Sequence, residues 1–396
     1  MRYTWALALI IITLITSACA IPGSEFPPEK ETASTQVPGV AETFTGQAIS
    51  TDTPSPPVTS SPTATPIATE TSTPLPSATP TISLTPDPAD PYELYTIEHL
   101  ANRAYGGGGK LKIEETLAEN SYFTRYLFTY PSDGLTIYGF LNTPKEDGSS
   151  SRSPAGNTQE MSIGNMPLVI VLHGYIDPLI YDTIDYTTRY ADALARKGFL
   201  VLHPNLRNYP PSDEGDNFFR VGMAIDVLNL ISLVREQAGK PGPLELADPD
   251  AIGLWGHSMG GGVSTRVMTV SPDVRAVLLY GSMSGDEQKN FERIFSYFSN
   301  GERGLEELAV PPESIQQISP VNYLDRVQAA VSIHHGKADV DVPLAWSLET
   351  CRRLRDLDVQ VECYAYENQP HTFYGDSDAL FMSRMIEFFD RVLRED

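Results

Sequence analysis

Apolar and polar positions change their pattern at about residue 89, after which strand-like and helix-like segments alternate. Residues 168–172 form an uninterrupted apolar run, which is typical of a strand buried on both faces of a parallel sheet. Apolar residues three and four positions apart, as in residues 218–238, predict helices between such strands. We expect strands at 123–130, 135–141, 168–172, 199–202, 251–255, 274–280, 330–333 and 360–366, and helices at 92–105, 181–196, 218–238, 259–270, 343–357 and 379–394.

This alternation predicts an α/β fold with a mostly parallel, eight-stranded sheet and helices on both of its faces. Residues 123–141 are expected to form an antiparallel hairpin, and the Ser/Gly-rich residues 145–165 a loop. Residues 283–319 lie between two predicted strands and are expected to form a small lid. Its four aromatic residues either line a substrate pocket or pack the lid onto the core: Phe291, Phe295, Tyr297 and Phe298.

The first 19 residues carry the pattern of an export signal. An apolar run at residues 5–15 follows Arg2 and is too short to span a bilayer, but it has the length of a signal-peptide core. The stretch Thr16-Ser17-Ala18-Cys19-Ala20 resembles a bacterial lipobox, with Cys19 as the lipidated residue. It departs at Thr16, where an aliphatic residue is usual, and it also fits ordinary secretory cleavage. We expect an exported protein, anchored at the cell surface through Cys19 or otherwise secreted.

Residues 20–88 have no hydrophobic period. Of the 30 residues from 51 to 80, 22 are Thr, Ser or Pro, and such sequence buries too little apolar surface to offset the entropy of folding. We predict a disordered stalk at residues 20–88, followed by a folded domain at residues 89–396.

The net charge argues against nucleic acid as a partner, and the cysteine content bears on metal binding and disulfide formation. The chain has 28 basic and 51 acidic residues and a net charge of −23, which repels nucleic acid. The spacing of the three cysteines does not match that of known metal-ligand motifs, so the sequence indicates no metal site. Cys351 and Cys363 form either a disulfide or two buried thiols. Membrane contact is expected only through the N-terminal lipid, and the oligomeric state is not indicated.

The strongest chemical signal is the segment Gly256-His257-Ser258-Met259-Gly260 between a predicted strand and a predicted helix. This is the context of a nucleophile elbow, a tight turn that exposes a serine hydroxyl above the sheet. The glycines remove side chains that would clash, and the Met259 N–H at the start of the helix can donate to an oxyanion. The alternative interpretation is a glycine-rich helix cap.

A serine needs a general base, and the base needs an acid to orient it. His371 follows the last predicted strand, and Asp339 follows the strand before it. Asp341 is a second candidate for the acid. The order Ser258, acid, His371 is the order that this type of fold uses. Residues 171–175 follow a buried strand, and the Tyr175 N–H is the candidate second oxyanion donor; His173 is interpreted as a structural turn residue, and His257 as a packing residue.

From about residue 123 onward, the chain resembles an α/β-hydrolase of the prolyl oligopeptidase and dienelactone hydrolase type. Four segments carry the resemblance: Asp133-Gly134-Leu135-Thr136-Ile137-Tyr138-Gly139 at the hairpin, His173-Gly174, His203-Pro204-Asn205-Leu206-Arg207, and Gly336-Lys337-Ala338-Asp339-Val340-Asp341-Val342-Pro343. The last resembles the family's G-x-x-D-x-x-V-P signature. Its aspartate is the triad acid, so the resemblance implies Asp339 rather than Asp341.

Two departures shape the expected function. About 120 residues precede the hairpin, and most of them are predicted to be disordered, so the β-propeller usual in prolyl oligopeptidases is not expected. The motif Gly-His-Ser-Met-Gly-Gly resembles esterases and lipases more than those peptidases. We therefore expect a cofactor-free carboxylic-ester hydrolase. The alternatives are a serine peptidase that acts on short peptides and a non-catalytic surface binding protein.

Overall fold

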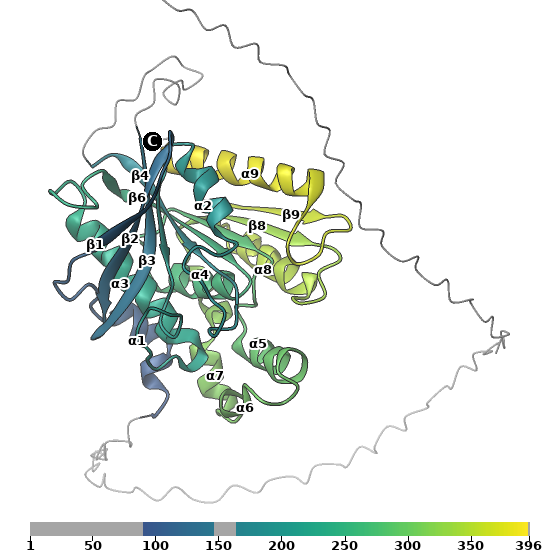
Figure 1. Cartoon of the computed structure of the whole chain (residues 1–396). Coiled ribbons are helices and arrows are strands. Elements are labelled where there is room, and N and C mark those ends of the chain that lie inside the picture. The colour runs from purple at the N-terminus through teal and green to yellow at the C-terminus, as the bar shows by residue number, and fades with distance from the viewer. Residues whose placement is uncertain (1–89, 146–163, 395–396) are drawn as a thin grey trace, which may run out of the picture. The chain divides into compact units, whose positions relative to one another are not determined.

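The computed structural model describes residues 90–145 and 164–394, whose centre is one twisted sheet (Figure 1). The predicted signal peptide, Cys19, the predicted stalk and most of the predicted loop at 145–165 lie outside these residues. The strands are β1 (Lys112–Glu119), β2 (Phe123–Ser132), β3 (Leu135–Pro144), β4 (Met166–Leu172), β5 (Leu200–Pro204), β6 (Ala247–His257), β7 (Ala276–Tyr280), β8 (Ala330–Gly336) and β9 (Val361–Tyr366). Their order in the sheet is β1-β2-β3-β5-β4-β6-β7-β8-β9.

The sheet has nine strands, so the expected count of eight was wrong. The additional strand is β1, which pairs with β2 at the edge of the sheet. All eight of its residues are exposed. A strand that buries neither face leaves no alternation of apolar and polar residues in the sequence. The pairs β1–β2, β2–β3 and β3–β5 are antiparallel, and the remaining pairs from β5 to β9 are parallel.

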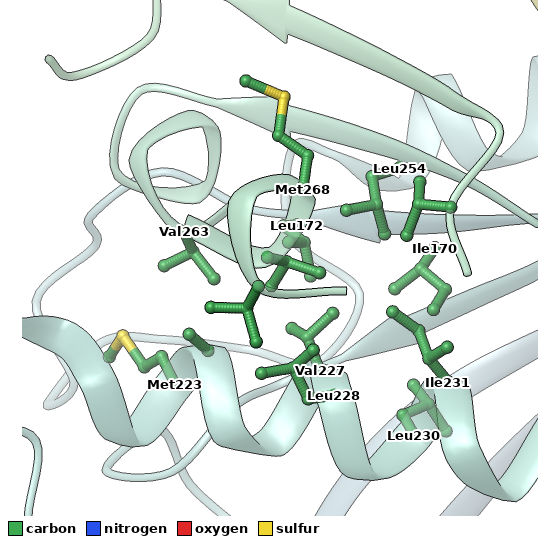
Figure 2. Packing of buried hydrophobic residues seen from close by; sticks show 14 of the residues in the cluster. Ile170, Leu172, Met223, Val227, Leu228, Leu230, Ile231, Leu254, Val263 and Met268 are labelled. Carbon is green, nitrogen blue, oxygen red and sulfur yellow. The ribbon is translucent and has the colours of Figure 1, made fainter. Parts of the chain in front are cut away.

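The apolar run in β4 is buried on both faces because its successive residues enter two different cores. Leu168, Ile170 and Leu172 pack in one cluster, whereas Val169 and Val171 pack in the other. The first cluster is covered by α1 (Ile97–Asn102), α3 (Val221–Gln237), α4 (Met259–Val270) and α8 (Leu344–Asp356). The second is covered by α2 (Thr188–Ala195) and α9 (Gly375–Arg394). Figure 2 shows Val227, Leu228 and Ile231 of α3 packing against Ile170 and Leu172 of β4.

Several helices are shorter than the periodicity predicts. The segment expected as a helix at 92–105 contains a 3-10 turn (Glu93–Tyr95) and α1, separated by Thr96, whose side chain caps the N-terminus of α1. In the segment 218–238, the 3-10 turn Phe218–Arg220 precedes α3. Phe219 and Arg220 have φ values of 51° and 56°, so α3 begins only at Val221. Only the second half of the segment 181–196 is helical, as α2.

The expected lid segment between β7 and β8 is helical. It contains α5 (Glu287–Arg293), a π-helical turn (Ile294–Phe298), α6 (Leu305–Leu308) and α7 (Pro312–Ile318), and the 3-10 turn Pro320–Arg326 leads to β8. Phe291 is buried against Phe219, with ring centroids 5.1 Å apart. Tyr297 and Phe298 are exposed. The lid aromatics therefore divide between the core and the surface.

Cys351 of α8 and Cys363 of β9 form a disulfide, which resolves the choice that the sequence left open. It ties α8 to the strand that precedes His371. None of the helices within 90–145 and 164–394 combines the length and apolar character needed to cross a membrane.

Candidate active site

Ser258 occupies a strained turn between β6 and α4. Its φ and ψ are 53° and −114°, a conformation that residues with a side chain rarely adopt. The turn is possible because its neighbours are small. A Cβ at Gly260 would lie 2.3 Å from the Leu172 carbonyl oxygen, and a Cβ at Gly256 would lie 2.4 Å from the Gly260 carbonyl oxygen. This is the geometry of the predicted nucleophile elbow.

The carboxyl ends of four parallel strands bring the candidate residues to one edge of the sheet. Ser258 follows β6, Asp339 follows β8 and His371 follows β9, as the sequence predicts. The Tyr280 carbonyl at the end of β7 accepts the Ser258 N–H at 3.0 Å. At the next residue, a Cβ on Gly281 would lie 3.1 Å from His371 Nδ1. Tyr280 and Gly281 therefore link the serine to the histidine.

His371 is paired with Asp339. Its Nδ1 lies 2.7 Å from Asp339 Oδ2, and the side chain of Asp339 is fully buried, whereas that of His371 is 16% exposed. Because a carboxylate can only accept, Nδ1 carries the proton and Nε2 is left as the basic atom. Asp341, the competing candidate, instead accepts a hydrogen bond from the Tyr297 hydroxyl at 3.2 Å.

Asp339 is held by four donors. Its Oδ1 accepts the backbone N–H groups of Asp341 and Val342, each at 2.9 Å. Its Oδ2 accepts from His371 and also lies 3.2 Å from His335 Nε2. Burial by itself would raise the pKa of Asp339, but the hydrogen bonds from His335 and His371 outweigh it and hold that pKa well below its ordinary value. Asp339 is therefore charged at neutral pH and stabilises a protonated His371.

Sequence reasoning did not identify His335 as part of this arrangement. Its Nε2 also lies 3.0 Å from the Val342 carbonyl oxygen, and its Nδ1 lies 2.8 Å from the Ser347 hydroxyl. Two oxygen acceptors face Nε2, so that atom carries the proton, which is donated to the Val342 carbonyl oxygen beside Asp339 Oδ2. The available signal was the histidine four residues before the acid in His335-Gly336-Lys337-Ala338-Asp339.

The two expected oxyanion donors lie on either side of the elbow. Met259 is the first residue of α4, and Tyr175 follows Gly174, where a Cβ would lie 3.1 Å from Ser258 Cβ. Within residues 90–145 and 164–394, neither the Met259 N–H nor the Tyr175 N–H has a protein acceptor. Both groups are thus available to an oxygen that develops negative charge beside Ser258.

A second feature that the sequence did not reveal is the position of Tyr186. Its hydroxyl accepts the Gly174 N–H at 2.7 Å and lies 2.7 Å from His257 Nδ1. His257 Nε2 lies 3.1 Å from the His371 carbonyl oxygen, which requires a proton on Nε2 and lets Nδ1 accept from Tyr186. Burial lowers the pKa of His257 to about 3, so it is neutral. This network connects the oxyanion loop, the elbow and the His371 loop, and His257 is a packing residue as expected.

His173 is also buried, with its ring nitrogens 2.7 Å and 2.9 Å from the carbonyl oxygens of Gly174 and Asn205. Burial lowers its pKa. It thus orders the turn that carries Tyr175, in agreement with its expected structural role.

The hydroxyl of Ser258 forms no hydrogen bond with any described residue, so no other group within residues 90–145 and 164–394 holds it in a fixed direction. Asp339, Asp341 and His371 also place possible metal-ligand atoms within 4.8 Å of one another. However, the oxygens of Asp339 accept N–H donors, and His371 Nδ1 donates. A cation would have to displace these bonds, so the donor set fits an acid–base pair better than a metal centre.

Two family models match the chain. A model described as the prolyl oligopeptidase family matches residues 241–396, and a model described as the alpha/beta hydrolase fold matches residues 167–310. Both ranges include Ser258, and the first also includes Asp339 and His371. The fold expected from the sequence, with a mostly parallel sheet between helices, is confirmed.

Solved structures of both esterases and peptidases are similar to the chain. A puromycin-hydrolyzing peptidase from Mycobacterium tuberculosis has a TM-score of 0.55 at 17% identity over 71% of this chain and 41% of that one. Acetyl xylan esterase 1 from Thermoanaerobacterium sp. has a TM-score of 0.54 at 17% identity over 75% and 93%. An acylaminoacyl peptidase from Pyrococcus horikoshii has a TM-score of 0.51 at 21% identity over 70% and 43%. The chain thus aligns with less than half of either peptidase.

Proposed function

We propose that this chain, a serine hydrolase of the α/β-hydrolase type, cleaves carboxylic esters of small molecules. The observation that carries the proposal is the joint arrangement of Ser258 in its strained turn and His371 held at 2.7 Å by a buried carboxylate. An ester needs an activated hydroxyl, a base that can return its proton and a place for the oxyanion.

In the proposed reaction, Ser258 Oγ attacks the ester carbonyl carbon while His371 Nε2 takes its proton. The negative oxygen accepts the N–H groups of Met259 and Tyr175, and Asp339 stabilises the imidazolium. His371 then protonates the leaving alcohol, which leaves an acyl group on Ser258. A water molecule repeats the sequence with His371 as base, and the acid is released. The residues themselves supply each proton transfer.

The extent of similarity favours an ester over a peptide. The alignment spans 93% of the acetyl xylan esterase, but only 41% and 43% of the two peptidases. The elbow sequence Gly256-His257-Ser258-Met259-Gly260-Gly261 also resembles that of esterases and lipases more than that of prolyl oligopeptidases. A peptidase acting on short peptides is the second candidate, and the match of residues 241–396 to the prolyl oligopeptidase family favours it.

We further propose that the protein is exported and that Cys19 carries a lipid, on the strength of the sequence pattern at residues 1–19. The folded domain is proposed to begin at about residue 89.

The test uses an unactivated ester and a peptide on the same protein. The full chain and Ser258→Ala are incubated with an acetylated sugar and with a dipeptide anilide, and released acetate and aniline are measured. Acetate release that disappears in the variant is the expected result. Cleavage of the anilide without acetate release would overturn the ester proposal in favour of a peptidase.

A further inference from the structure

The lid segment contains two arginines, and their guanidinium groups have different contacts. Arg293 is tied to the loop of the proposed triad acid: its guanidinium donates to the carbonyl oxygens of Val340 and Asp341. Arg303 has no such role. Its guanidinium carbon lies 4.8 Å from the centroid of the Tyr175 ring, and within residues 90–145 and 164–394 it forms no ion pair.

Arg303 is connected to the site through Tyr175, whose ring it contacts. The Tyr175 N–H is one of the two proposed oxyanion donors, and the preceding Gly174 approaches Ser258. Tyr209 gives a second connection, since its hydroxyl lies 3.9 Å from the sulfur of Met259, the other proposed donor. Burial raises the pKa of Tyr209, and the positive charge of Arg303 acts in the opposite direction.

The lid backbone fixes the position from which Arg303 extends. Ser299 Oγ accepts the Arg303 N–H at 2.9 Å, and Gly304, the next residue, has a φ of 92°. The Arg303 side chain remains exposed. An arginine on an aromatic platform keeps its planar N–H donors pointing outward, where they can bind a carboxylate in two-pronged fashion.

We propose that Arg303 and Tyr175 form a subsite for a carboxylate on the substrate, so that the preferred esters carry a negative charge. This inference rests on the proposed ester hydrolysis and names its substrate class. In a protein with a net charge of −23, Arg303, which pairs with no carboxylate among the described residues 90–145 and 164–394, gives a local exception to the repulsion of anions. Asp177 forms no ion pair with Arg303 within residues 90–145 and 164–394; its Oδ1 accepts the Leu179 N–H at 3.0 Å within its own loop.

The test measures selectivity between paired substrates rather than activity alone. One pair carries the charge on the alcohol side, as para-acetoxybenzoate and its methyl ester. The other carries it on the acyl side, as monophenyl adipate and methyl phenyl adipate. We expect the full-length protein to favour the charged member of at least one pair. The ratio of kcat/KM for the charged over the neutral member should fall about fivefold in Arg303→Gln, as for an exposed charge-assisted contact.

Arg352→Gln is the matched control, because Arg352 is an exposed arginine on α8 that pairs with Asp356. It should leave the ratio unchanged, and Arg303→Lys should give an intermediate ratio. The preference should also weaken as salt is raised, because screening shortens the range of exposed charges. An unchanged ratio in Arg303→Gln, or an equal loss for both members of each pair, would overturn the proposal and leave Arg303 a structural role in the lid. If the parent protein cleaves none of the four esters, the proposed ester hydrolysis itself would be contradicted.

Discussion

His335 Nε2 lies 3.2 Å from Asp339 Oδ2, the same oxygen that accepts the His371 Nδ1 proton at 2.7 Å. The acid of the proposed triad is thus held between two histidines of different character. The side chain of His335 is buried, and its Nδ1 lies 2.8 Å from the Ser347 hydroxyl, whereas the side chain of His371 is partly exposed. We infer that His335 positions the carboxylate and that His371 performs the proton transfer.

The pairing of His371 with Asp339 predicts unequal effects at two neighbouring aspartates. Asp339→Asn replaces an acceptor by an amide that no longer fixes the His371 tautomer, so kcat for ester hydrolysis should fall about 10³- to 10⁴-fold. Asp341→Asn is the control: it alters only a contact with Tyr297 and should cost less than about tenfold in kcat. Steady-state kinetics of both variants distinguish the two, and a larger loss in Asp341→Asn would move the acid to that residue.

The lowered pKa of Asp339 predicts how stability depends on pH. A carboxyl whose pKa is lower in the folded than in the unfolded state stabilises the fold above its unfolded pKa of about 4. That contribution is lost as the pH falls toward the folded pKa. In His335→Ala one donor is removed, so the folded pKa of Asp339 rises and the acid-dependent part of the free energy of unfolding becomes smaller.

Urea unfolding of the parent protein, His335→Ala and His335→Gln at a series of pH values between about 2 and 7 provides the measurement. Glutamine keeps an N–H donor and should behave more like the parent protein. Parallel pH profiles for the parent protein and His335→Ala would show that His335 does not act on Asp339.

A side chain added at Gly281 should disturb His371, and this effect on activity can be separated from the cost of backbone strain. It has a φ of 49°, and an added Cβ would lie 3.1 Å from His371 Nδ1. Gly281→Ala should therefore displace His371 and lower kcat by about tenfold or more, in addition to a stability cost of about 1–2 kcal/mol for a left-handed alanine. Gly375 has a φ of 61° and nothing within 4 Å of an added Cβ. Gly375→Ala should show a similar loss of thermal stability with kcat retained; equal kcat values in the two variants would refute the contact.

The disulfide predicts a redox-dependent stability. The Cys351–Cys363 bond closes a short loop between α8 and β9, and loop closure of this size contributes about 3 kcal/mol. The double variant Cys351→Ser/Cys363→Ser should lower the melting temperature, and a reducing agent should destabilise the parent protein but not the variant. Mass spectrometry of the unreduced chain should find the two cysteines linked. A melting temperature that is insensitive to reduction would contradict a stabilising bond.

Elements with a buried face were the ones that the sequence predicted well. The apolar run of β4 and the glycine-flanked Ser258 follow directly from burial and steric rules, and α4 has the predicted bounds Met259–Val270. The strand β1 was missed because it buries neither face. The start of α3 was placed too early because the left-handed residues Phe219 and Arg220 are apolar or long and give no local sign of a turn.

The reacting residues of the site could be predicted because the chemistry requires particular residue types. The residues that only support them could not, because the chemistry does not require a particular residue type there. Ser258, a histidine and an aspartate follow from the needs of the reaction, but spacing alone allowed Asp339 and Asp341, and the resemblance to a known signature favoured the first. Tyr186 was missed because its partner His257 lies 71 residues away, and His335 was missed because a histidine four residues before the acid does not by itself indicate a contact with it. The Ser347 that orients His335 lies on α8. Tyr186 joins Gly174, in the loop after β4, to His257, the last residue of β6.

Labelling of the full-length protein with a fluorophosphonate, followed by mass spectrometry of its peptides, tests whether Ser258 is an activated nucleophile. Such a probe reacts with a serine only when a neighbouring base activates it. We predict one adduct, on Ser258, that is lost in Ser258→Ala and forms much more slowly in His371→Ala. Absence of labelling in a protein with a cooperative thermal transition, or an adduct on another serine, would contradict the assignment of Ser258 as the nucleophile.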